Sequence, residues 1–317
     1  MGLLSMFGGN PLKIGLVGLG KIAVDQHIPS INGNKKLKLV AGCSPNGRPE
    51  GVVAYATLEE MLHKHPDIEA VAICTPPQIR HTIAKQVIEG GRHVFLEKPP
   101  AATLGEAEAL KTLAAAKGVT LLASWHSRFA PAVEATRAWI AARKLKSVTV
   151  VWKENVRQWH PGQTWIFKAG GMGVFDPGIN SLSILTRILP GQVLVKTADL
   201  HIPGNCEAPI QVEMDLLSEA GVPVRAEYDF LQTGLQTWSI FVESEAGEKL
   251  TLSLGGTELE IDGKVLIKEK EAEYAGLYAH FHDLVRNKQS DADFQPLRVV
   301  ADAMLLGKRI TAPDYVE

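Results

Sequence analysis

The chain has 317 residues, about twice the length of an average domain, which excludes a small scaffold held together by disulfides. Its 33 Lys and Arg residues nearly balance 35 Asp and Glu residues, and 45% of all residues are hydrophobic. This balance argues against a nucleic-acid-binding surface, a polybasic membrane patch and disorder.

The three cysteines, Cys43, Cys74 and Cys206, lie far apart and form no CxxC pair, so they indicate neither a disulfide framework nor a zinc ribbon. Residues 1–11 lack the basic lead and the small-residue cleavage site of a secretion signal. No apolar run approaches the length of a membrane span. We therefore expect a cytoplasmic protein with no membrane or nucleic-acid partner.

Short apolar runs alternate with longer amphipathic stretches from Leu12 to Ser124, which is typical of strand and helix units wound into a parallel sheet. Helices are expected after a capping box at Thr57-Leu58-Glu59-Glu60 and over Thr103–Ala116. The expected strands are Lys13–Gly18, Leu37–Cys43, Ala70–Thr75, His93–Leu96 and Val119–Ala123. Residues 1–125 therefore form one expected domain, a doubly wound α/β sheet.

The rhythm changes after Phe129, where a helix over Pro131–Arg143 leads into a series of alternating runs. The expected strands are Val148–Val156, Val193–Ile202, Ile210–Leu217, Val222–Phe230, Thr237–Glu243 and Lys249–Leu254. Strands that follow one another through short turns imply a large, mainly antiparallel sheet. Residues 126–317 are thus an expected α+β domain, which ends in helices over Glu271–Lys288 and Pro296–Arg309. Because such a sheet commonly offers a face to a partner, we expect a homo-oligomer through it.

Gly18, Gly20 and Ala23 form a G-x-G-x-x-A pattern between the first strand and the first helix. Gly18 permits the tight turn, Gly20 lets the backbone approach a pyrophosphate at the helix N-terminus, and Ala23 allows close packing of helix on sheet. The pattern predicts a Rossmann dinucleotide-binding domain, with Lys21 and Ile22 as further cofactor contacts. A tight turn without a cofactor is the alternative.

The second strand ends in Cys43-Ser44-Pro45-Asn46, where an NAD-binding protein carries an Asp or Glu for the ribose. No carboxylate is present there, and Ser44 with nearby Arg48 could receive a 2′-phosphate by hydrogen bonding and charge pairing. The sequence therefore favours NADP. NAD stays open, because the same residues could form an ordinary solvated turn.

Two further segments follow strands at the sheet edge where ligands of such folds bind. Thr75-Pro76 follows one strand and Glu97-Lys98-Pro99-Pro100 follows another, so we expect Thr75, Pro76, Glu97 and Lys98 to contact the cofactor. The flanking prolines make the loop of Lys98 rigid, which favours a positioned side chain. An exposed ion pair between Lys98 and Glu97 is the alternative.

Together with Gly170-Gly171-Met172-Gly173-Val174-Phe175-Asp176-Pro177-Gly178-Ile179-Asn180, these motifs resemble the Gfo/Idh/MocA (glucose-fructose oxidoreductase / inositol dehydrogenase) family over essentially the whole chain. The resemblance implies a nicotinamide-dependent dehydrogenase in which Lys98 and Asp176 face the nicotinamide. The usual family His, four residues after the Asp, is Asn180 here. Because an amide cannot take up a proton, either Asp176 or Lys98 must be the general base. We favour Asp176, with Lys98 and Asn180 holding the reacting hydroxyl. Capping of the helix that they open is the alternative.

The stretches Trp125–Phe129, Trp152–Glu154 and Arg157–Trp165 resemble the branch of that family that oxidises C1 of aldoses such as L-arabinose, D-galactose and D-fucose. Pyranose rings present an apolar face beside their hydroxyls, which suits aromatic platforms with a few polar groups. We expect Trp159 and Trp238 to stack on the sugar and His126 and Glu154 to bind its hydroxyls. Ordinary core packing is the alternative for each tryptophan.

Two other functions remain open at this point. One is a dehydrogenase of the same fold that acts on an inositol or a dihydrodiol, and the other is a sugar and nucleotide sensor without turnover.

His63 with His65 and His280 with His282 have spacings that metal sites use, but no recognisable ligand pattern surrounds them, so we expect no metal.

Overall fold

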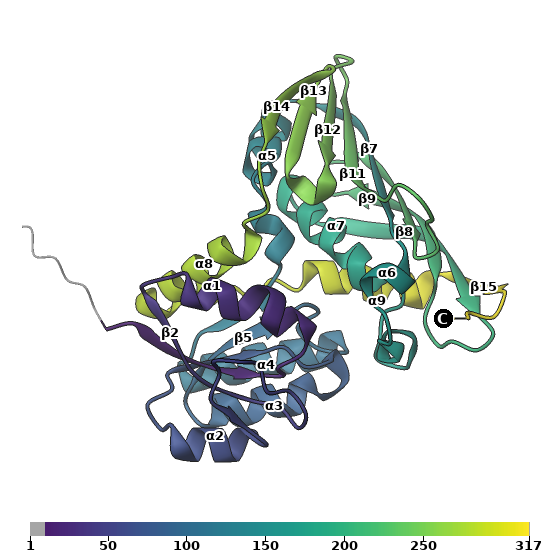
Figure 1. Cartoon of the computed structure of the whole chain (residues 1–317). Helices are drawn as coiled ribbons and strands as arrows, with labels where there is room; N and C mark the ends of the chain where they lie inside the picture. The colour runs from purple at the N-terminus through teal and green to yellow at the C-terminus, as the bar shows by residue number, and fades with distance from the viewer. Residues whose placement is uncertain (1–9, 317) are drawn as a thin grey trace, which may run out of the picture. The chain divides into compact units, whose positions relative to one another are not determined.

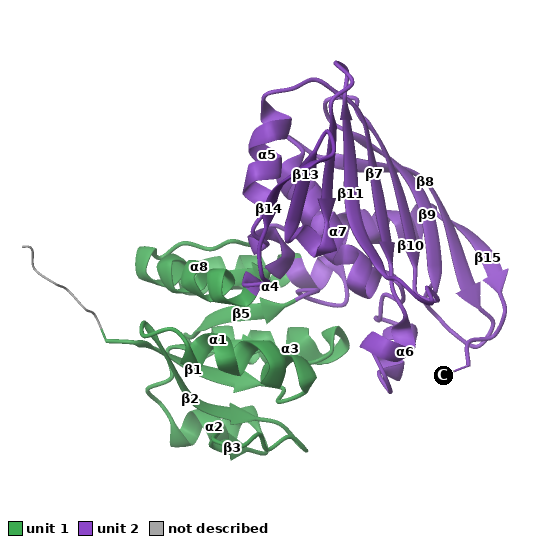
Figure 2. Cartoon of the chain, turned by 45° about the horizontal axis from the view of Figure 1, so that its top comes forward, with its two compact units in different colours: residues 1–97, 108–124, 274–292 green, residues 98–107, 125–273, 293–317 purple. Residues whose placement is uncertain are grey.

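The structure is a computed structural model that describes residues 10–316, and it divides into two compact units (Figure 2). Unit 1 comprises residues 1–97, 108–124 and 274–292, and unit 2 comprises residues 98–107, 125–273 and 293–317. The units therefore interleave along the chain, whereas the two expected domains meet at a single boundary. The expectation of no secretion signal rests mainly on residues 1–9, which lie outside the described residues.

Unit 1 contains a six-stranded sheet in the order β3-β2-β1-β4-β5-β6, in which every neighbouring pair is parallel (Figure 1). The strands are β1 (Leu12–Val17), β2 (Leu37–Cys43), β3 (Ala54–Tyr55), β4 (Ala70–Ile73), β5 (His93–Glu97) and β6 (Leu121–Ser124). All residues of β4 and β6 are buried, as expected of strands covered on both faces. This strand order is that of a Rossmann fold and confirms the expected N-terminal architecture.

Capping residues begin two helices of this α/β arrangement. The Thr57 hydroxyl accepts from Glu60 N, as the expected capping box requires, and the Thr103 hydroxyl accepts from Glu106 N in the same way. The helices are η1 (a π-helix, Ala23–His27), α1 (Ile28–Asn32), α2 (Leu58–Lys64), α3 (Pro77–Glu89), α4 (Leu104–Lys117) and α8 (Glu273–Asn287). The first residues of α4 and the first residue of α8 belong to unit 2.

Unit 2 contains a nine-stranded sheet in the order β14-β13-β12-β11-β7-β10-β9-β8-β15. The strands are β7 (Leu145–Lys153), β8 (Val193–Pro203), β9 (Gln211–Ser218), β10 (Pro223–Asp229), β11 (Thr237–Ser244), β12 (Lys249–Ser253), β13 (Glu258–Ile261), β14 (Lys264–Lys268) and β15 (Lys308–Ala312). Only β7 with β10 and β8 with β15 pair in parallel, so the expectation of a large, mainly antiparallel sheet is confirmed.

Burial alternates along the central strands of this sheet, because helices α5, α7 and α9 cover one of its faces (Figure 1). The helices of unit 2 are η2 (His126–Phe129), α5 (Val133–Ala141), α6 (Val156–Trp159), η3 (Thr164–Phe167), α7 (Phe175–Ile188), η4 (Leu254–Gly256) and α9 (Gln295–Leu306). The other face carries ion pairs such as Lys153 with Glu227. Self-association through this sheet stays a prediction.

Four short strands and one helix end differ from the sequence expectations. Strand β3 has two residues, and β13 and β14 form a hairpin around Asp262-Gly263, whose φ angles are 48° and 80°. Positive φ at both positions is the backbone of a type I′ turn, which Asp-Gly favours. The helix expected to reach Arg309 ends at Leu306, because Gly307 is extended and β15 starts at Lys308. Over residues 10–316, no helix has both the length and the apolar character that a membrane crossing requires.

Candidate active site

The glycine turn after β1 has the backbone that its sequence predicts. Gly18 has a φ of 87°, and a Cβ atom there would lie 3.0 Å from the backbone of Cys74 and Thr75. Only glycine combines this conformation with so close an approach of the two loops. Ala23 is fully buried under the following helix, as the third small residue of the pattern should be. Lys21 is exposed and pairs with Asp25.

Two features of unit 1 fit a bound dinucleotide. A Cβ atom on Gly20 would meet no atom within 4 Å, so the backbone is open to a ligand at this position. The hydroxyl of Thr75 is buried and has no hydrogen-bond partner among residues 10–316. A buried polar atom without a partner commonly marks a place where a ligand or water binds. Ile22 is partly exposed beside the turn, and Pro76 directly precedes α3, at its N-cap position.

The loop after β2 brings Ser44 and Arg48 together. The Ser44 hydroxyl accepts from Gly47 N at 3.2 Å, and Arg48 Nη1 donates to the carbonyl oxygens of Ser44 and Gly47 at 2.6 and 2.7 Å. The guanidinium group therefore lies over this loop at the surface of unit 1. The position expected to select between NAD and NADP thus carries a hydroxyl and a cation on one turn.

The side chain of Glu97 makes contacts inside unit 1, and the expected contact of this residue with the cofactor stays a prediction. It is buried, and its Oε1 accepts from Tyr274 Oη at 2.6 Å and lies 3.1 Å from His27 Nε2. The Arg80 guanidinium donates to the carbonyl oxygens of both Glu97 and Thr75. These bonds join the ends of β4 and β5 to α8 and fix the point at which the chain leaves for Lys98.

Two cysteines, buried Cys43 and half-buried Cys74, lie at the carboxyl ends of strands in unit 1. Burial raises the pKa of Cys43 to about 11, and burial together with the charge of Glu97 raises the pKa of Cys74. Both side chains are therefore neutral thiols near pH 7. They act as small packing groups rather than as nucleophiles.

Lys98 and Asp176 form an ion pair within unit 2. Lys98 Nζ lies 3.1 Å from Asp176 Oδ2 and donates to the main-chain oxygen of Asp176 at 2.9 Å. The two side chains are 15% and 4% exposed, so little water screens them. Asp176 is in the first turn of α7, and no side-chain capping bond is found at that helix start. Its carboxylate therefore does not cap the helix.

One cavity of about 330 Å³ in unit 2 collects the residues expected to bind substrate. Lys98 and Asn180 line it, and Asn180 lies one helical turn after Asp176, which places both on one face of α7. The other expected residues that line the cavity are His126, Glu154, Trp159 and Trp238. Segments far apart in the sequence thus build one pocket.

Two tryptophans and the carboxylate of Glu154 contact one another in this pocket. Trp238 Nε1 donates to Glu154 Oε2 at 2.8 Å, and Glu154 is buried. The rings of Trp159 and Trp238 meet edge to face, 5.5 Å apart at an angle of 74°. Trp159 is 42% exposed, which is unusual for a tryptophan that serves only as core. The arrangement offers aromatic surface and a hydrogen-bond acceptor side by side.

His160 also belongs to this pocket, although the sequence analysis gave it no role. Its Nε2 lies 3.3 Å from Glu154 Oε1, and its Nδ1 lies 3.9 Å from Asp176 Oδ2. Nδ1 is buried and makes no hydrogen bond to residues 10–316. An imidazole is therefore present between two carboxylates. The one feature of the sequence that could have indicated this place for His160 is that it directly follows Trp159.

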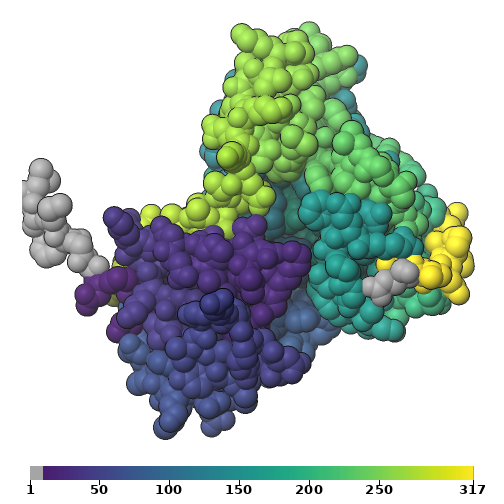
Figure 3. All heavy atoms as spheres, in the orientation of Figure 1, coloured from purple at the N-terminus to yellow at the C-terminus, as the bar shows by residue number. Residues whose placement is uncertain are grey.

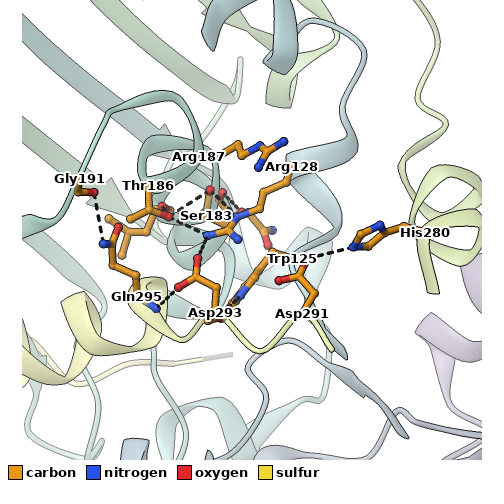
Figure 4. A network of polar contacts seen from close by, with 12 residues as sticks. Trp125, Arg128, Ser183, Thr186, Arg187, Gly191, His280, Asp291, Asp293 and Gln295 are labelled. Atoms are coloured by element: carbon orange, nitrogen blue, oxygen red, sulfur yellow. Dashed lines mark hydrogen bonds and ion pairs between the residues drawn. The ribbon is translucent and has the colours of Figure 1, made fainter. Parts of the chain in front are cut away.

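His126 is held by a residue far away in the sequence. Its Nδ1 contacts Glu273 Oε2, and both residues line the pocket. Arg128, in the same short helix η2, donates to Ser183 O, Thr186 Oγ1 and Asp293 Oδ2 (Figure 4). These bonds attach η2 to α7, so the helix that carries His126 has a fixed place beside the helix that carries Asp176.

The histidines for which the sequence predicted no metal contact other protein side chains. His65 Nε2 hydrogen-bonds with Tyr55 Oη at 3.0 Å, His280 pairs with Asp291 and His282 with Asp283. Within residues 10–316, no group of three or more His, Cys, Asp or Glu side chains is arranged to hold a metal.

Known proteins resemble this chain over nearly its full length. Residues 12–124 match the family model GFO_IDH_MocA, described as an oxidoreductase family with an NAD-binding Rossmann fold. A galactose 1-dehydrogenase from Pseudomonas fluorescens is 44% identical over 310 residues, which are 97% of this chain and 99% of that protein. The crystal structure of a D-galactose-1-dehydrogenase from Rhizobium etli is 50% identical, covers 97% of this chain and 99% of that chain, and gives a TM-score of 0.93.

A more distant structure shares the fold alone. It is a 3-ketoreductase from Actinomadura kijaniata in complex with NADP and TDP-benzene, with a TM-score of 0.84 at 16% identity. The match covers 96% of this chain and 100% of that chain. The two-unit architecture therefore persists where most side chains differ.

Proposed function

The chain belongs to the Gfo/Idh/MocA oxidoreductase family, and we propose that it is an NAD(P)-dependent aldose 1-dehydrogenase that oxidises C1 of an aldopyranose to the lactone. The observation that carries the proposal is the single pocket that contains Lys98 and Asn180 together with Trp159, Trp238 and Glu154. The likeness to galactose 1-dehydrogenases over almost the entire chain supports the same reaction class.

Unit 1 would hold the nucleotide at Gly18, Gly20 and Thr75, where the backbone is open at Gly20 and the buried hydroxyl of Thr75 has no hydrogen-bond partner among the described residues. A bound nicotinamide supplies the acceptor for the electron pair that leaves the C1–H bond. We propose NADP as the preferred form, because Ser44 and Arg48 share a turn where a carboxylate would repel a 2′-phosphate.

Asp176 is the proposed general base. Its Oδ2 takes the proton of the C1 hydroxyl as the C1–H bond breaks, and Lys98 Nζ holds the same oxygen at 3.1 Å. The ammonium group also stabilises negative charge on the sugar oxygen before the proton has fully left. Asn180 donates or accepts a hydrogen bond without exchanging a proton, so its role is to orient that hydroxyl.

The remaining pocket residues recognise the sugar in this proposal. Trp159 and Trp238 cover apolar C–H groups of the ring, and Glu154, His126 and His160 bind hydroxyls. L-Arabinose, D-galactose and D-fucose share their configuration at C2, C3 and C4, so one pocket accepts all three. They differ only at C5, where an added carbon is worth about 1–3 kcal/mol in such a pocket.

The test is an absorbance assay of nucleotide reduction with L-arabinose, D-galactose, D-fucose, D-glucose and myo-inositol, each with NADP and with NAD. The proposal expects turnover with the first three sugars and a higher kcat/KM with NADP. Turnover only with the inositol would assign a different reaction to the fold. Binding of NADP without turnover of any sugar would favour a sensor.

A further inference from the structure

Residues 313–316 are fastened to a part of unit 2 that is distant in the sequence. Strand β15 runs parallel to β8, and the residues after it lie against the turn around Asn205. Asn205 Nδ2 donates to Tyr315 O at 2.8 Å, and Asn205 Oδ1 accepts from Tyr315 N at 2.9 Å. Figure 3 shows this yellow segment beside teal atoms. We call residues 313–316 the strap.

The strap also contacts the loop that carries two pocket residues. The guanidinium carbon of Arg157 lies 5.0 Å from the centre of the Tyr315 ring, and Arg157 Nη2 donates to Val316 O. Arg157 precedes Trp159 and His160 in the same short segment, α6 and its C-terminal end. The strap therefore contacts the chain at Arg157, which lies two and three residues before the pocket residues Trp159 and His160.

A row of aromatic rings leads from the strap to His160. The ring of Tyr315 is 4.9 Å from that of Phe167, which is 6.0 Å from that of Phe230. Phe230 in turn is 5.6 Å from the imidazole of His160. Each pair lies within the range of favourable aromatic contacts, so a change at Tyr315 reaches His160 through two rings.

Main-chain hydrogen bonds join this loop to other segments: Val156 N donates to Phe230 O, Gly173 N to Ile166 O and Glu207 N to Phe167 O. Between residues 156 and 168 the chain forms two helices of four residues each and no strand. A second cavity of about 220 Å³ adjoins the loop, and its lining includes His160, Phe167, Asn205 and Tyr315. Because His160 lines both cavities, close packing does not hold its far side. The contact of Nε2 with Glu154, the rings and the strap limit its movement.

We propose that Tyr315 and Arg157 are positioning residues for the sugar: they hold the 156–168 loop so that Trp159 and His160 face the pocket. This inference rests on the proposed function, because it assumes that these two side chains bind the substrate. It assigns no contact with the sugar to the strap itself.

The test compares Tyr315→Ala, Tyr315→Phe, Arg157→Leu and Val316→Ala. Tyr315→Ala should raise the KM for D-galactose about tenfold, since it removes both the ring contact with Phe167 and the cation–π contact with Arg157. Arg157→Leu should act in the same direction, and Tyr315→Phe should restore the parent KM to within about twofold. Val316→Ala is the control, because the contact uses only the main-chain oxygen of Val316.

Two measurements separate positioning from general damage. The KM for NADP should stay at the parent value in every variant, and trypsin should cleave after exposed Lys168 faster in Tyr315→Ala but not in Tyr315→Phe. An unchanged sugar KM in Tyr315→Ala would overturn the inference, as would an equal rise in the KM for NADP. A parent protein without aldose turnover would instead contradict the proposed function, while proteolysis would still report whether the strap holds the loop.

Discussion

Lys98 Nζ lies 3.1 Å from Asp176 Oδ2 and 2.9 Å from the main-chain oxygen of the same residue. The ammonium group thus binds Asp176 at two points and fixes the direction of its carboxylate. Both side chains are mostly shielded from water, which strengthens their attraction relative to a surface pair. A carboxylate held in this way is suited to take a proton from one defined hydroxyl.

The first prediction concerns that carboxylate. Asp176→Asn should keep the shape of the side chain and lower kcat for D-galactose by about 10²- to 10⁴-fold, because the amide cannot accept a proton. Steady-state kinetics with NADP measures the effect, and a melting curve checks the fold. Asp302→Asn makes the same substitution in α9 and is the matched control. A kcat within a few-fold of the parent would show that Asp176 is not the base.

The second prediction concerns the pocket wall. Trp238→Phe keeps an aromatic ring but removes the N–H group that holds Glu154 at 2.8 Å. A hydrogen bond to a charged group is worth about 1.5–3 kcal/mol, so the KM for the sugar should rise roughly 10- to 100-fold. Phe241→Leu, on the same strand β11, should leave it unchanged. Equal KM values for both variants would mean that Glu154 does not depend on Trp238.

The third prediction uses two glycines with similar backbones. Gly18 and Gly91 have φ angles of 87° and 73°, but a Cβ atom on Gly18 would press on the backbone of Thr75 while one on Gly91 would meet open space. Gly18→Ala and Gly91→Ala should therefore share a strain of about 1–2 kcal/mol. Only Gly18→Ala should also weaken NADP binding, by about tenfold or more, as measured by fluorescence titration. Equal affinities would place the nucleotide elsewhere.

The fourth prediction concerns cofactor choice. Ser44→Asp should lower kcat/KM with NADP and shift the preference toward NAD by about tenfold, because a carboxylate repels a 2′-phosphate and accepts from a ribose 2′-hydroxyl. Asn46→Asp adds the same charge two residues away on the same loop and should have a smaller effect. If both substitutions change the ratio equally, the effect is one of general charge and Ser44 has no special position.

Much of the fold follows from local sequence patterns. Short-range signals predicted strands and a helix start that the folded chain does form. These signals are the apolar runs at Leu37–Cys43 and Ala70–Ile73 and the capping threonine Thr57. Asp262-Gly263 is a hairpin signal of the same kind, which the sequence analysis did not use. The return of α8 to unit 1 could not be predicted, because Tyr274 and Tyr278 reach Glu97 and His27 across long sequence separations.

The pocket likewise contains some residues that were predicted from the sequence and others that only long-range contacts bring into place. Trp159, Trp238 and Asn180 were predicted from residue chemistry and a family resemblance, and they line one cavity. Glu273 was not predicted, because its contact with His126 spans 147 positions and no motif surrounds it. The orientation of His160 depends on Glu154 and on the ring of Phe230, which is distant in the sequence, so only the folded chain reveals it.

The central claim, oxidation at C1, is tested most directly by following the carbon itself. D-Galactose labelled with ¹³C at C1 is incubated with the protein and NADP, and the product is examined by ¹³C NMR. The account predicts that the labelled anomeric signal disappears and that a labelled lactone or carboxylate signal replaces it in proportion to the NADPH formed. A product in which C1 remains anomeric while another ring carbon has become a ketone would contradict it.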